Sequence, residues 1–185
     1  MSTAPDYFQW FHLLPAFDLD EAALLPRYRE LQKQFHPDRV AAEPAEVQRA
    51  AVQKAADINA AFSTLHDPVS RARYLLTLAG HLLANESATV ADVDFLMAQL
   101  ELREQLEEAD APAALVGLRE EAEDWLKNLG REFDSDYRRQ DWAEAADTVR
   151  KMQFMSRFIH EISDAEARLE EAEYDNENDD DGEDD

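Results

Sequence analysis

The stretch LQKQFHPDRV, residues 31–40, places a histidine, a proline and an aspartate where a helical pattern breaks off. Proline has a fixed φ angle, lacks a backbone donor, and moves the residue before it out of the α region. The sequence therefore predicts that a helix ends before Pro37 and that a rigid polar loop exposes His36 and Asp38. The same residue types also satisfy backbone groups in ordinary turns, so the triplet alone is compatible with a simple turn.

The segments on both sides of this triplet have the periodicity of amphipathic helices. Before it, apolar side chains recur at helical spacing at Leu24, Tyr28, Leu31 and Phe35. Asp20 is placed to cap this helix, and Pro26 is expected to weaken or kink its first turns. After the triplet, a longer pattern over residues 47–65 ends at the Asp67–Pro68 pair, and a shorter helix runs on to Gly80.

The composition favours an all-α protein throughout. Of 185 residues, 45% are hydrophobic and only 4 are glycine, and good helix formers are abundant. The formal net charge of −24 argues against a nucleic-acid-binding protein, which needs a basic surface. The absence of cysteine excludes disulfides and thiolate metal sites. There is neither a signal-peptide pattern nor an apolar run long enough to cross a membrane, so we expect a soluble, intracellular protein. The cytoplasm in particular is implied only by the family resemblance given below.

The second half of the chain carries three more helical patterns, which predict a three-helix bundle over residues 92–174. The first pattern is DVDFLMAQLELREQLEEA, the second begins near Ala113, and the third begins near Asp141. Each is long enough to bury one apolar stripe against the other two.

Two segments lie outside these helices. Residues 80–91 are expected to form a connection, in which Thr89 or Asp92 is able to cap the following helix. Residues 175–185 hold eight acidic side chains and no basic one. Because they have little to bury, we expect a solvated, disordered acidic tail.

The surroundings of the triplet resemble a known domain. It lies between the helical sequence RYRELQKQF and a second helix containing DINAAFSTLHDPVSRARYLL, with the aromatic segment YFQWFHLL ahead of both. Over about residues 6–77 this arrangement resembles the J-domain of DnaJ-like co-chaperones. In that family two antiparallel helices flank an HPD loop that stimulates ATP hydrolysis by a DnaK-class chaperone. The resemblance implies that residues 1–79 form a J-domain.

The resemblance also implies a chaperone-binding surface made of the triplet and the basic residues around it. By position these are His36, Pro37, Asp38, Arg27, Arg29, Lys33 and Arg39. Arg29 and Lys33 are four residues apart and share a helix face, although any one of these charges is also compatible with ordinary solvent exposure. Glu30 interrupts the basic run of general J-domains, which favours a dedicated chaperone partner.

A catalytic role for the triplet has little support in the sequence. No obvious nucleophile accompanies His36 and Asp38, and no pocket-forming pattern surrounds them. The five histidines show no metal-ligand spacing. We therefore expect no enzymatic activity, no bound metal and no cofactor of the chain's own.

The first helix of the second half has two apolar stripes where a bundle needs one. One stripe is expected to face the core and contains Phe95, Gln99, Leu102 and Leu106. The other lies on a different face and contains Val93, Leu96, Met97 and Leu100. The second stripe either packs on the first half of the chain or is exposed to a partner.

The third helix shows a similar pattern. If Trp142, Val149 and Ile159 mark its buried side, Phe154 and Phe158 are expected to project away from the core. Large apolar side chains outside a core and rimmed by carboxylates are typical of docking sites. Core packing remains the alternative for each of these residues singly.

A second resemblance covers nearly the whole chain. The segments DYFQWFHL, LMAQLELREQLEE and AADTVRKMQFMSRF, combined with a J-domain, are similar to the HscB family of J-type co-chaperones of iron–sulfur cluster assembly. In that family the C-terminal bundle binds the cluster scaffold protein IscU and delivers it to the specialised chaperone HscA. The residues that match the scaffold-binding face are Leu96, Met97, Leu100, Glu101, Glu104 and Phe154.

The function that this resemblance implies is that of an adaptor with two partners. The bundle would capture the scaffold protein and the HPD loop would stimulate the chaperone, to which the ATP belongs. The alternatives are a J-type co-chaperone that delivers a different client, and a helical structural adaptor that has no effect on a chaperone ATPase.

Overall fold

The computed structural model describes residues 6–81 and 92–180, and side chains as far as residue 172. The chain divides into two compact units, Met1–Leu83 and Ala84–Asp185, and each is described here by itself. The described residues are overwhelmingly helical and contain no strand, so the predicted all-α class is confirmed. No helix in the described ranges is long and apolar enough to span a membrane.

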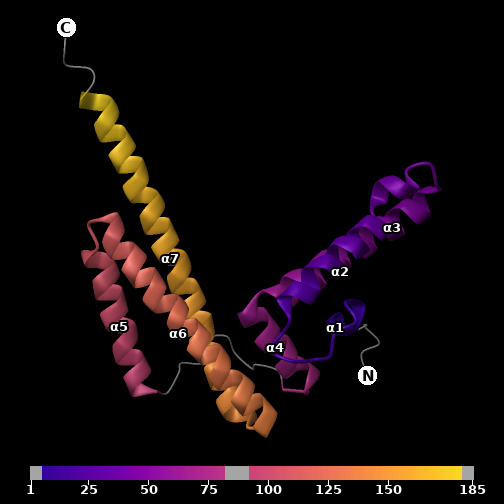
Figure 1. The fold of residues 1–185 in the computed structure, drawn as a ribbon, viewed down its shortest axis with the longest axis horizontal. Coiled ribbons are helices and arrows are strands. Elements are labelled where there is room, and N and C mark those ends of the chain that lie inside the picture. Colours follow the sequence, from indigo (N-terminus) through magenta and orange to yellow (C-terminus); the bar gives the residue numbers. More distant parts are fainter. Residues whose placement is uncertain (1–5, 82–91, 181–185) are drawn as a thin grey trace. The chain divides into compact units, whose positions relative to one another are not determined.

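The first unit is built around two long paired helices (Figure 1). Its elements in chain order are α1 (Tyr7–Trp10), α2 (Glu21–Gln34), the short 3-10 helix η1 (Pro37–Val40), α3 (Ala45–His66) and α4 (Pro68–Leu78). The chain reverses direction through η1, and α2 therefore packs against α3 in the antiparallel arrangement expected of a J-domain. Helix α1 and α4 also pack on α3 and complete the core.

Aspartates mark the helix boundaries of this unit. The carboxylate of Asp20 accepts a hydrogen bond from the backbone N–H of Ala23 at 3.3 Å, which is the expected cap of α2. Asp67 leaves the α region before Pro68, ends α3, and accepts a hydrogen bond from Ser70 N at 2.7 Å at the start of α4. Pro26 lies within α2, yet the helix continues through it to Gln34.

The core of the first unit is apolar and holds one buried cation. Its largest fully buried side chains are Phe8, Phe11, Leu24, Ile58, Leu65, Leu75 and Leu76. The guanidinium of Arg71 donates a hydrogen bond to the Leu65 carbonyl at 2.6 Å and lies 5.2 Å from the centre of the Phe17 ring. Burial is the main cause that lowers the pKa of Arg71, and nearby Glu21 opposes this effect. These contacts hold the end of α3, the start of α4 and the α1–α2 connection together.

The second unit is a bundle of three helices that run alongside one another (Figure 1). They are α5 (Val93–Glu108), α6 (Pro112–Arg139) and α7 (Trp142–Asp180). Helices α6 and α7 share the most extensive interface, and Gln140, at a φ of 59°, forms the tight turn between them. Along this interface Arg119 forms a two-pronged ion pair with Glu166 and donates a hydrogen bond to Ser163 Oγ at 2.9 Å. The predicted three-helix bundle is therefore present.

The end of the bundle differs from the sequence prediction. Helix α7 continues to Asp180, whereas we expected a disordered tail from residue 175 onwards. The turns before residue 175 are rich in the good helix formers glutamate and alanine, and α7 has already been nucleated and packed along its earlier turns, so the helix continues into the acidic segment. Residues 175–180 are thus helical where the sequence predicted a tail, and residues 181–185 lie outside the described part of the chain.

Candidate functional site

The HPD triplet forms an exposed loop at the end of α2. His36 has φ −63° and ψ 130°, which is extended, and helix α2 ends at Gln34 as the proline effect predicts. Nδ1 of His36 accepts a hydrogen bond from the backbone N–H of Asp38 at 3.3 Å and lies 3.5 Å from its carboxylate Oδ2. The His36 and Asp38 side chains are 57% and 89% exposed, so the loop is ordered locally and still accessible to a partner.

A concave surface adjoins this loop and gathers several of the predicted basic residues. It lies between the end of α2, the loop and the middle of α3. Its lining comprises Arg29, Gln32, Lys33, His36, Pro37, Arg39, Ala55 and Asn59, and we call it the basic groove. Arg39 is also tied to the end of α2, because its guanidinium donates a hydrogen bond to the Lys33 carbonyl at 3.3 Å. On a chain with a net charge of −24, this is a local concentration of positive charge beside the HPD loop.

Arg27 does not belong to this groove. It is half-buried, and its guanidinium Nη1 donates hydrogen bonds to the backbone carbonyls of Phe11 and, at 2.6 Å, His12. These carbonyls follow α1, where the chain turns and His12 has a φ of 52°. Arg27 therefore anchors the N-terminal segment to α2 and lies apart from the basic groove, while its part in chaperone binding stays a prediction.

Three polar residues that the sequence did not mark as site residues lie at the groove and its margin. The hydroxyl of Tyr28 donates a hydrogen bond to Asn59 Oδ1 at 3.0 Å, and the Gln32 amide donates to the same oxygen at 3.3 Å. The Tyr28 ring stacks on Phe62 with 3.9 Å between ring centres. This network joins α2 to α3 beside the loop. The four-residue spacing of Tyr28 and Gln32 is visible in the sequence, but their shared partner on α3 is not.

A second exposed surface lies on α5. Val93, Met97 and Leu100 are 67%, 55% and 58% exposed, while Phe95 and Leu102 on the opposite face are buried. The prediction that this helix has two apolar faces, one of them outside the core, is therefore confirmed. Among the other residues predicted to bind the scaffold, Leu96 is half-buried, and Glu101 and Glu104 are exposed. We call the surface formed by Val93, Leu96, Met97, Leu100, Glu101 and Glu104 the α5 face.

Phe154 and Phe158 do not project away from the core, as we had expected. Their side chains are only 8% and 1% exposed. Phe154 makes an edge-on contact with Phe95 at 5.8 Å and stacks on Phe158 at 6.0 Å between ring centres. The prediction took Trp142, Val149 and Ile159 to mark the buried side of this helix, but Trp142 and Ile159 are only half-buried. Phe154 therefore supports the α5 face from behind.

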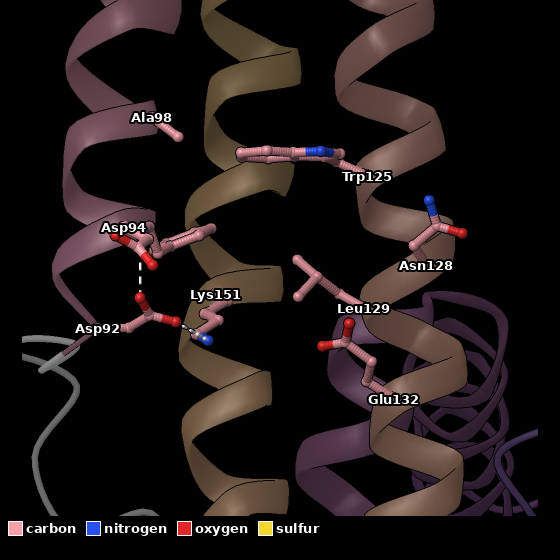
Figure 2. Close-up of a pocket in the computed structure, with 9 residues that line it drawn as sticks. Asp92, Asp94, Ala98, Trp125, Asn128, Leu129, Glu132 and Lys151 are labelled. Carbon is pink, nitrogen blue, oxygen red and sulfur yellow. Dashed lines mark hydrogen bonds and ion pairs between the residues drawn. The ribbon is translucent and has the colours of Figure 1, made fainter.

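An ion pair joins the start of α5 to α7, beside a groove in the bundle (Figure 2). Lys151 Nζ lies 2.6 Å from Asp92 Oδ2, and the other carboxylate oxygen of Asp92 accepts a hydrogen bond from Phe95 N at 3.1 Å. Asp92 is thus the cap of α5, whereas the alternative cap Thr89 lies outside the described residues. The hydrogen bond from Lys151 is the main cause that lowers the pKa of Asp92.

Lys151 shows the complementary shift. Burial is the largest single influence on its ammonium group and opposes the charge, but the hydrogen bond and charge of Asp92, with the charges of Asp147 and Glu132, outweigh burial. The pKa of Lys151 is therefore raised. Because both shifts favour the charged forms, the pair is ionised over a broad pH range.

The exposed HPD loop, the antiparallel pair α2–α3 and the adjoining basic groove define the first unit as a J-domain, and the chain as a J-type co-chaperone with an added helical bundle. A family model described as the HSCB C-terminal oligomerisation domain matches residues 91–163. The co-chaperone protein HscB homolog of Acinetobacter baumannii is 43% identical over 166 residues, which cover 89% of this chain and 92% of the relative.

Solved structures agree with this result. The chaperone HscB from Vibrio cholerae has a TM-score of 0.76 and 37% identity, over 89% of this chain and 99% of its own. Human co-chaperone protein HscB has a TM-score of 0.81 and 28% identity, over 88% of this chain and 83% of its own. The chain belongs to the HscB family, and it is a co-chaperone of iron–sulfur cluster assembly.

Proposed function

We propose that the chain binds the scaffold protein IscU through the α5 face and stimulates ATP hydrolysis by the chaperone HscA through the HPD loop. The observation that carries this proposal is the exposed His36–Pro37–Asp38 loop at the rim of the basic groove. The chain itself acts as an adaptor, and the ATP and its hydrolysis belong to the chaperone.

The basic groove supplies the contact to the chaperone. The cationic side chains of Arg29, Lys33 and Arg39 attract an acidic surface and orient it against the loop. Pro37 holds the loop in one conformation before binding, so little conformational entropy is lost when the chaperone docks. His36 and Asp38 then reach the chaperone as exposed polar groups and favour its hydrolysis-competent state.

The α5 face supplies the contact to the scaffold. Met97 and Leu100 offer apolar area that is desolvated on binding, while Glu101 and Glu104 form a charged rim. Leu96 is half-buried at the edge of this face. Phe154 of α7 packs on Phe95, on the inner side of α5. Binding of client to one unit and of chaperone to the other brings the two partners together, so hydrolysis is stimulated where client is present.

A steady-state ATPase assay tests this function. HscA is measured alone, with this chain, with IscU, and with both together. The expected result is stimulation by the chain and a larger, more than additive stimulation when IscU is also present. The absence of any stimulation by the chain would contradict the proposal and favour a purely structural adaptor.

The alternative is that the chain delivers a different client to a DnaK-class chaperone. The exposed apolar side chains of the α5 face are compatible with this alternative, because such a surface can bind any client of complementary shape. Direct titrations with IscU decide between the two. Binding of IscU in the micromolar range or tighter supports the specific assignment, and the alternative holds if IscU does not bind while another client does.

A further inference from the structure

Helix α5 is held to its unit by few apolar contacts. Of its side chains, Phe95 and Leu102 are buried, whereas Val93, Met97 and Leu100 point to solvent. Helices α6 and α7 instead bury apolar residues along most of their shared interface. The position of α5 therefore depends on a small number of interactions, and each of them contributes a large part of the free energy that holds the helix in place.

Asp92 and Lys151 provide one of these interactions at the start of α5. One oxygen of Asp92 caps the helix through Phe95 N, and the other accepts a hydrogen bond from Lys151 of α7 at 2.6 Å. Lys151 is only 17% exposed, and its ammonium group also lies 5.6 Å from the centre of the Phe95 ring. The Asp92 carboxylate thus caps the N-terminus of α5 and also links α5 to α7 through the ion pair.

A groove opens beside this pair. The groove is lined by residues of α5, α6 and α7, among them Phe95. Trp125 and Leu129 on α6 lie across it from Ala98 on α5 (Figure 2). The Phe95 and Trp125 rings stack with 6.0 Å between their centres, and this aromatic contact joins α5 to α6 beside the groove. The start of α5 is consequently held by the charged pair and by Phe95, with open space beside them.

We propose that Asp92 and Lys151 are positioning residues for client binding, because their ion pair sets the position of α5 and with it the α5 face. This inference rests on the proposed function of that face. Side chains on one helix move together, and Val93 and Met97 lie in the first turns of α5, nearest to the pair. Release of the pair lets this end move away from α7 and lowers the fraction of molecules that present the face in its binding position.

Two measurements on the full chain test this inference. Hydrogen exchange of the α5 backbone amides reports the opening of the helix, and calorimetric titration with IscU reports client binding. Lys151→Met keeps an apolar stem and removes the charge, and Lys151→Arg keeps the charge. Asp92→Asn keeps the oxygen that caps α5 and removes the ion pair. Lys127→Met is the matched control, because Lys127 is exposed on α6.

We expect Lys151→Met and Asp92→Asn to raise exchange in the first turns of α5 and to weaken IscU binding, each by about three- to tenfold. Lys151→Arg should restore most of both losses, and Lys127→Met should change neither. Exchange in α6 and α7 should stay at the wild-type level, which separates an effect on α5 from general unfolding.

Three outcomes overturn the inference. They are unchanged exchange in α5, faster exchange with wild-type affinity for IscU, and an equal effect of Lys127→Met. Failure of the proposed function gives a different result, since the wild-type chain itself then does not bind IscU. If the wild-type chain does not bind IscU, the positioning role for client binding is contradicted as well, whatever the hydrogen-exchange measurement shows.

Discussion

At the scale of single residues, the proposed role of the HPD loop in chaperone stimulation is separable from folding. His36 and Asp38 are exposed and contribute no side chain to either core. We expect His36→Gln or Asp38→Asn to abolish stimulation of the HscA ATPase while IscU affinity and the thermal unfolding midpoint stay within error of wild type. His160→Gln is the matched control, because His160 is exposed on α7. An equal loss of IscU binding would contradict the separation of the two sites.

Met97 and Phe154 should respond in opposite ways to truncation, although the sequence placed both on the client surface. Phe154 is 8% exposed and packs on Phe95 and Phe158, so Phe154→Ala is expected to lower the free energy of unfolding by about 3–5 kcal/mol. Met97 is 55% exposed, so Met97→Ala should change stability by less than about 0.5 kcal/mol.

For the affinity for IscU, we expect Met97→Ala to have the larger effect of the two substitutions. Met97→Ala is expected to cost about 1–3 kcal/mol of IscU affinity, since exposed apolar anchors are desolvated at an interface. Urea denaturation and titrations with the folded variants measure the two effects separately. A large stability loss for Met97→Ala would return its side chain to the bundle core.

At the scale of elements, the attachment of α5 should depend on pH. The folded-state pKa of Asp92 is lowered by Lys151, so its contribution to stability is present above the unfolded value of about 3.9 and is lost as the pH falls through the folded value. The folded-state pKa of Lys151 is raised, so its contribution is present below the unfolded value of about 10.4 and is lost as the pH rises through the folded value. Asp147 and Glu132 also face Lys151 and sustain its charge.

The measurement is urea denaturation across the acid range for the wild type and Asp92→Asn. Asparagine keeps the helix cap but does not titrate, so the difference in unfolding free energy should be largest near neutral pH and should vanish below the pKa of Asp92 in both states. A difference that does not change with pH would show that the ion pair has no part in stability.

The helices themselves were largely predictable because their signals are local. Asp20 and the Asp67–Pro68 pair marked boundaries, and the break at Pro37 followed from backbone sterics alone. The buried side of α7 was predicted correctly only at Val149, because the other two residues taken to mark it, Trp142 and Ile159, are half-buried. The true stripe runs through Ala145, Val149, Met152, Met155, Phe158 and Ile162. The extension of α7 was missed because acidic composition indicates solvation and says little about helix continuation.

The candidate surfaces were predictable only in part, for a different reason. The HPD loop and the exposed face of α5 follow from sequence spacing. The supporting contacts do not, because they join residues far apart in the chain. Arg27 with the Phe11 carbonyl, and Asp92 with Lys151, become visible only when the elements pack.

At the scale of the whole molecule, the two proposed contacts should respond differently to salt. The proposed chaperone contact is the basic groove on a chain of net charge −24, and exposed charges are screened beyond about 8 Å at physiological ionic strength. The α5 face is mainly apolar. We expect the affinity for HscA to fall steeply between low and high salt and the affinity for IscU to change much less. Matching salt slopes for the two partners would contradict this assignment of surfaces.

The two faces of α5 have an evolutionary consequence. The inner face, through Phe95 and Leu102, serves the fold, and the outer face, through Val93, Met97 and Leu100, lies in solvent. Substitutions on the outer face therefore carry little penalty in stability. If this face binds a client as proposed, selection acts on it mainly through that client, and it is free to diverge along with the client from one lineage to the next, while the inner face is constrained to keep the bundle intact.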